Sequence, residues 1–267
     1  MKVLKRTIVF DFKRIISSWQ LYFAFGIIVI GAIITFARNL SVRDLQRLIS
    51  VGTLNTFIYS NIMENNVTIL LAPVIAGLVY STTIIDDMKT GIYRQLAFRI
   101  RPLKYIKSKI ISSIIFGGGI FLISYILIFF VTFILDPSAS VRTIYNRKAL
   151  FGLIYDRSML LYCFAFIGYS FIYGAVYSLV SLGVAMITRN KYMTIGLPFF
   201  ICYSATYFTN LLPQNISDIF LYILPYNTFD ITLFSPFYYL FQLGFTLVIG
   251  IIMIKIGSKT ILENGTI

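Results

Sequence analysis

Long apolar runs alternate with short polar segments along this chain, and six of the runs are long enough to cross a lipid bilayer as helices. A helix rises about 1.5 Å per residue, so a hydrocarbon core of about 30 Å takes roughly 20 apolar residues. The predicted spans are residues 19–36, 67–85, 110–135, 159–187, 192–208 and 237–256, the fifth being interrupted by Pro198. We therefore expect an all-α, polytopic membrane protein in which residues 1–267 form a single transmembrane domain.

The first 18 residues are too charged to cross the bilayer, but they are amphipathic. On a helical wheel one face carries Leu4, Ile8, Phe12 and Ile15, and the opposite face carries Lys2, Arg6 and Lys13. This pattern predicts a helix that lies in the membrane interface and leads into the first span. Taken alone, this pattern is equally typical of a positively charged membrane anchor that has no further task.

Composition and charge agree with a membrane location. Only 12% of the residues are charged and 58% are hydrophobic, and the net charge of +13 comes from basic clusters between the apolar runs. Assigning the connecting segments to alternate sides places 16 Lys and Arg residues on one side and 7 on the other. The positive-inside rule then predicts cytoplasmic termini in the plasma (inner) membrane, with the first run retained as a span, and it explains the charge better than nucleic-acid binding does.

The residue types present exclude most enzyme classes. Histidine is absent, which removes histidine-based acid–base catalysis and metal ligation, and Cys163 and Cys202 both fall inside apolar runs. No phosphate-binding loop is present, since the nearest string, residues 257–260, lacks the adjacent Gly-Lys pair. We expect no catalytic residue, no metal site and no cofactor bound by this chain.

The polar segment between the second and third spans has a distinctive order. Asp86 and Asp87 follow the second span, Gly91 stands four positions after Asp87, and a basic, proline-bearing turn precedes the third span. Ile85, Met88, Ile92 and Leu96 recur at helical spacing, which predicts a short surface helix with the acidic pair near its N-terminal end.

With this segment the chain resembles the membrane subunits of ABC-2 type transporters, the permeases that pair with a separate ATPase. The family usually has Glu at the position of Asp87 and Thr at that of Ile92, and its proline stands closer to the glycine than Pro102 does. The resemblance implies six spans, a cytoplasmic coupling helix, and short outer helices between the last two spans, here within residues 209–236. The coupling residues would be Asp86, Asp87, Gly91, Ile92, Leu96, Arg101 and Pro102.

The same resemblance implies the partners and the task. Two permease chains, identical or related, would work with two ATPase subunits that hold ATP and Mg²⁺. The complex would export a hydrophobic or amphipathic substrate such as a drug, a lipid or a peptide antibiotic.

The fourth predicted span carries two stripes. Tyr169, Tyr173 and Tyr177 continue a line begun by Tyr162 and Phe166, and they are either packing residues or part of a substrate path. Ser170, Gly174, Ser178 and Ser181 form a stripe of small residues, which favours close helix packing.

Three other classes stay open. An ion-driven secondary transporter is disfavoured because no ionisable residue lies near a predicted span centre. A membrane-embedded enzyme lacks histidines and paired intramembrane carboxylates. A non-transporting membrane partner or immunity protein differs in having no associated ATPase.

Overall fold

The computed structural model describes residues 2–39, 67–91, 102–135, 151–211, 213 and 236–264. Within these ranges the chain is helical and contains no strand. Its helices are α1 (Lys2–Ile16), α2 (Trp19–Asn39), α5 (Val67–Tyr80), α6 (Thr83–Lys89), α8 (Pro102–Leu135), α9 (Gly152–Arg157), α10 (Met159–Thr188), α11 (Lys191–Leu211) and α13 (Pro236–Asn264). The all-α prediction is therefore confirmed for the described residues.

Among the described residues, four segments are long and apolar enough to cross a membrane, namely Leu70–Lys89, Pro102–Ile134, Leu160–Thr188 and Phe237–Ile261. A fifth is present if α1 and α2, which meet at a bend of 60°, are taken as one crossing. Helix α11 contains Pro198 and falls outside this set. The structure thus supports a protein with four or five membrane-capable helices, and six crossings stay a prediction. The expected outer helices of residues 209–236 lie mostly outside the described residues.

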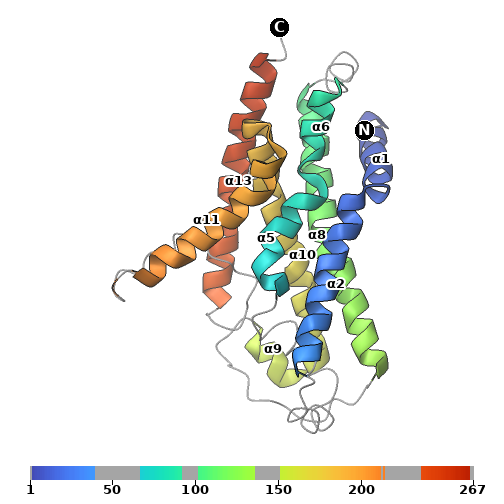
Figure 1. Cartoon of the computed structure of the whole chain (residues 1–267), viewed down its shortest axis with the longest axis vertical. Coiled ribbons are helices and arrows are strands. Elements are labelled where there is room, and N and C mark those ends of the chain that lie inside the picture. Colours follow the sequence, from blue (N-terminus) through green and yellow to red (C-terminus); the bar gives the residue numbers. More distant parts are fainter. Residues whose placement is uncertain are drawn as a thin grey trace.

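Helix α10 forms the centre of the bundle and packs against α13, α8, α5 and α11 (Figure 1). Glycines allow its closest approach to α8. A Cβ atom added to Gly174 would collide with the backbone of Gly117, and one added to Gly117 would collide with the side chain of Ser178. These contacts explain why α8 and α10 share one of the two most extensive helix interfaces in the described chain.

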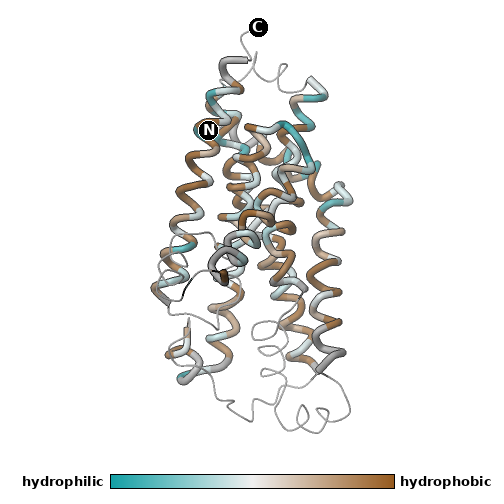
Figure 2. The backbone as a smooth tube through the Cα atoms, turned by 60° about the vertical axis from the view of Figure 1, so that its left-hand side comes forward, coloured by the Kyte–Doolittle hydropathy of each residue, from teal (hydrophilic) through white to brown (hydrophobic). Residues whose placement is uncertain are grey.

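One end of the bundle collects the polar positions. Helix α1, the end of α6, the start of α8 and the end of α13 all lie at the upper end in Figure 1. Hydrophobic residues cover most of the helix length, and hydrophilic residues gather toward that same end (Figure 2). The two chain-terminal helices therefore reach the same end of the bundle, as expected if both termini face one side of a membrane.

Candidate functional site

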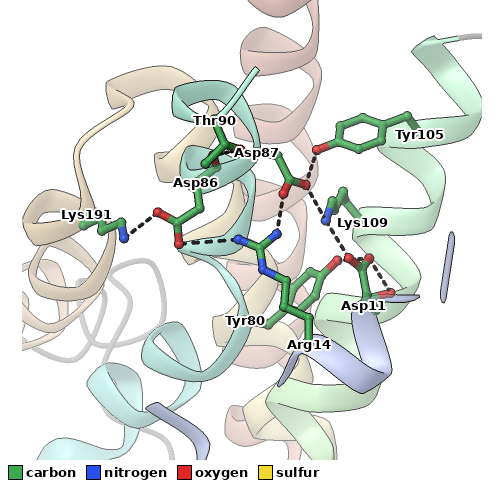
Figure 3. Close-up of polar contacts among 10 residues, drawn as sticks. Asp11, Arg14, Tyr80, Asp86, Asp87, Thr90, Tyr105, Lys109 and Lys191 are labelled. Carbon is green, nitrogen blue, oxygen red and sulfur yellow. Dashed lines mark hydrogen bonds and ion pairs between the residues drawn. The ribbon is translucent and has the colours of Figure 1, made fainter. Parts of the chain in front are cut away.

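Helix α6 ends the second membrane-capable segment and carries the acidic pair. A turn at Ser81 and Thr82 separates it from α5. At its other end the hydroxyl of Thr90 donates to the backbone oxygen of Asp86 at 2.8 Å, and Gly91 follows with a φ of 74°. A left-handed φ favours glycine, so Gly91 lets the chain turn sharply out of the helix. Both carboxylates are thereby held beside the neighbouring helices (Figure 3).

Lys109 of α8 is the centre of a buried ion cluster. Its Nζ atom lies 2.8 Å from Oδ1 of Asp11 on α1 and 2.8 Å from Oδ2 of Asp87 on α6. The three side chains are only 1%, 2% and 3% exposed, respectively. One ammonium group therefore joins carboxylates from two different helices in a place that water scarcely reaches.

Two tyrosines complete the surroundings of this lysine. Tyr80 donates its hydroxyl to Oδ2 of Asp11 at 2.6 Å, and Tyr105 donates its hydroxyl to Oδ2 of Asp87 at 2.7 Å. Each ring centroid is also 5.4 Å from the Nζ atom of Lys109, within the range of a cation–π interaction. The tyrosines thus bind both signs of charge, the carboxylates through their hydroxyls and the ammonium through their rings.

A second, more exposed set of contacts surrounds Asp86. Arg14 of α1 donates to Oδ1 of Asp87 and lies 3.7 Å from Oδ2 of Asp86, while Lys191 of α11 lies 2.5 Å from Oδ1 of Asp86. The side chains of Arg14, Asp86 and Lys191 are 28%, 29% and 38% exposed. Cations from three helices therefore hold α6, one buried on α8 and two near the surface on α1 and α11.

The two sets of contacts differ in energetic weight. Exposed ion pairs contribute about 0–1 kcal/mol, because water screens them and long side chains lose freedom. Removing one partner of a buried pair costs about 3–5 kcal/mol, because the other charge is left without compensation. The network contains three acidic and three basic groups, so its charges balance. Its buried part fixes α1, α6 and α8 together, and its outer part adds a weak tie to α11.

The structure places the predicted coupling residues unevenly. Asp86, Asp87 and Gly91 belong to α6 and its end, and Pro102 is the first residue of α8. Ile92, Leu96 and Arg101 lie outside the described residues. Asp87 was expected on a surface helix, but it is buried and its oxygens bind groups of this same chain. It therefore holds α6 in place rather than presenting a free carboxylate.

The tyrosine stripe of α10 is inside the bundle. Tyr169, Tyr173 and Tyr177 are all buried, and the rings of Tyr173 and Tyr177 stack with centroids 4.4 Å apart. The thiol of Cys202 on α11 donates to the hydroxyl of Tyr177 at 3.4 Å. In this arrangement the stripe packs helices against each other within one chain.

The small-residue stripe of α10 faces α8 and α5. Ser178 and Ser113 lie with their hydroxyl oxygens 2.5 Å apart, and Gly174 meets Gly117 as described above. Ser170 is buried and donates to the backbone oxygen of Ile167. Ser181 instead lies against α5. The stripe therefore lies at close contacts of α10 with two neighbouring helices.

Sequence reasoning missed the groups that bind Asp87. Lys109 was counted among the cytoplasmic positive charges, yet it is buried inside the membrane-capable segment Pro102–Ile134. A signal was present for Asp11, which stands between Ile8 and Ile15 at helical spacing and so interrupts the apolar face of α1. An acid on an apolar stripe needs a buried partner, and this requirement would have pointed to a lysine.

The arrangement supplies buried charge and connects α6 to three neighbouring helices. No group of three or more metal-ligating acids or cysteines occurs among the described residues. Comparison with protein-family models, with curated proteins and with solved structures finds no match for the chain.

Proposed function

We propose that this chain is the membrane-spanning permease subunit of an ABC-2 type exporter, which moves a hydrophobic or amphipathic substrate with ATP hydrolysed by a separate subunit. One observation carries the proposal. The acidic pair at the end of the second span is bound by cations from α1, α8 and α11. A displacement of the segment that follows α6 would therefore be transmitted to three helices at once.

Location supports the same interpretation. The network residues belong to α1, the end of α6, the early part of α8 and the start of α11. Helix α1, the end of α6 and the start of α8 lie at the end of the bundle that collects the hydrophilic residues. By the positive-inside rule that end faces the cytoplasm, where an ATPase would bind. The working unit would contain two permease chains and two ATPase subunits, with six spans in each permease.

The test uses the full-length chain in its own host. After extraction in mild detergent, the associated proteins are identified, and ATP hydrolysis by any ATPase with Walker motifs is measured with and without the chain. We expect such an ATPase to copurify and to hydrolyse ATP faster in the presence of the permease, with ATP-dependent export by membrane vesicles. If no ATPase binds and export proceeds without ATP, the proposal is refuted.

The buried ion cluster supports a second candidate, a carrier driven by protons or sodium ions. Charges buried in membrane-capable segments often mark ion pathways, and Asp11, Asp87 and Lys109 are such charges. All three lie toward the ends of these segments, so they would form the polar-end entrance of such a pathway. Vesicles distinguish the two candidates, because a carrier accumulates substrate under an imposed ion gradient without ATP, and an exporter of the proposed kind requires ATP.

A further inference from the structure

Helix α1 has two faces, and the protein covers only one of them. Thr7, Asp11 and Ile15 are buried against the bundle, where α1 packs mainly on α8. The other side exposes Val9, Phe10 and Ile16 by 43–52%. Phe12, which is 50% exposed, lies at the edge of this side, where its ring centroid is 5.7 Å from that of Phe116 on α8. Lys13 is exposed among them. The outward face therefore combines apolar surface with positive charge.

The junction between α1 and α2 locates this face relative to the bilayer. Helix α2 is apolar, begins at Trp19 and departs from α1 at 60°. Trp19 is 67% exposed and lies at this junction, with exposed Tyr22 and Phe23 next to it on α2. Tryptophan and tyrosine concentrate at the headgroup level of membranes. If α2 enters the bilayer at Trp19, the outward face of α1 lies among the headgroups.

The charges of α1 specify the kind of headgroup. The only acid in the helix is Asp11, which is 2% exposed and bound to Lys109. The basic residues of the helix are Lys2, Lys5, Arg6, Lys13 and Arg14. By their spacing, Lys2, Arg6 and Lys13 fall on one side of the helix, away from Asp11. A face with cations and no anion attracts anionic lipid more strongly than zwitterionic lipid.

We propose that the outward face of α1 is a binding surface for anionic phospholipid headgroups. The same helix supplies the buried Asp11 and the partly exposed Arg14 to the ion network. Lipid bound outside would hold α1 in place and thereby support the contacts of Asp87 inside. This inference is independent of what drives transport.

The chain contains its own probe for this surface, because Trp19 is its single tryptophan. The full-length protein is placed in nanodiscs of phosphatidylcholine and phosphatidylglycerol at equal mole fractions, with either one lipid or the other brominated. Bromine quenches tryptophan fluorescence on contact. We expect brominated phosphatidylglycerol to quench Trp19 more strongly than brominated phosphatidylcholine does.

Two matched variants test which charges matter. Each basic residue near a charged membrane surface contributes about fivefold in affinity, so Arg6→Gln with Lys13→Gln should lower the preference for phosphatidylglycerol by about tenfold or more. Lys255→Gln with Lys259→Gln removes the same charge from α13 and should leave the preference unchanged. Equal quenching by both lipids in the wild type, or equal losses in both variants, would overturn the proposal and leave this face to an acidic protein surface.

The link to the network has a separate readout. Phosphatidylglycerol should raise the unfolding temperature of the wild type in nanodiscs, and the increase should be lost in the Arg6 and Lys13 variant. An unfolding temperature that does not depend on the lipid would refute the link.

Discussion

Replacing Lys109 by methionine tests whether the buried ion cluster fixes α1, α6 and α8 together. Methionine keeps most of the length of the side chain and removes its charge, so Asp11 loses its salt bridge and Asp87 loses one of two. Removing one partner from a buried pair costs about 3–5 kcal/mol, since the remaining carboxylate stays out of water without full compensation. We expect a loss of that size in the free energy of unfolding.

The assay is reversible unfolding in mixed micelles, followed by circular dichroism. Lys104→Met is the matched control, because Lys104 is an exposed lysine one and a half turns earlier on the same helix. It should change stability by less than about 0.5 kcal/mol. Asp86→Asn should cost only about 0–1 kcal/mol, because that carboxylate is 29% exposed.

A compensating change sharpens the test. In the Lys109→Met variant the carboxylate of Asp11 has lost its salt bridge, and adding Asp11→Asn removes that carboxylate. Asp87 still has its salt bridge to Arg14. Replacing both partners of a buried pair is far less costly than removing one, so the double variant should regain about half of the lost stability or more. The reasoning is refuted if Lys109→Met is as stable as Lys104→Met, or if the double variant is no better than Lys109→Met alone.

Three further predictions concern glycines and the tyrosine stripe. Gly174→Ala should destabilise the protein by about 1–3 kcal/mol in the same assay, because its Cβ would strike the backbone of α8, whereas Gly119→Ala, with open space around it, should not. Gly91 has a φ of 74°, which asparagine tolerates and valine does not. Gly91→Val should therefore lower ATP-dependent or gradient-driven transport while leaving membrane insertion unchanged, and Gly91→Asn should keep most of the transport activity. Equal transport by the two variants would contradict the role of this turn. Tyr173→Cys should resist a water-soluble thiol reagent with and without substrate, because the position is buried; rapid labelling that substrate blocks would instead place it on a substrate path.

Hydropathy predicted where the membrane helices of the bundle lie in the sequence. Four of the predicted spans overlap membrane-capable segments, and a fifth does so only if α1 and α2 are counted as one crossing. Hydropathy locates these spans because burial in lipid demands unbroken apolar helices. The 192–208 run lies on α11, where Pro198 and several polar residues lower its hydropathy. The described residues contain four or five membrane-capable helices, and the sixth predicted span depends on α11.

The site was only partly predictable, because it consists of pairings between distant segments. The order of residues after the second span drew attention to Asp87 and Gly91, which are close together in the chain. The apolar periodicity, however, predicted a helix that continues past Gly91, whereas α6 ends at Lys89 and Gly91 has a left-handed φ of 74°. The partners of Asp87 are Arg14, Tyr105 and Lys109, and nothing local to α6 specifies which helix lies beside it. The positive-inside rule counts every lysine and arginine of a connecting segment, whether buried or exposed. It therefore grouped the buried Lys109 with solvent-exposed lysines of the same segment.

The salt bridge between Asp11 and Lys109 joins residues that are 98 positions apart in the chain, so its two partners are synthesised at different times. A ribosome releases the first helix long before the lysine that neutralises its acid exists. During that interval the carboxylate of Asp11 must stay hydrated, so α1 cannot take its final place until α8 has been inserted. Nascent chains that stop before residue 109 lack the lysine that pairs with Asp11, so this contact between α1 and α8 forms only after α8 has begun to be made.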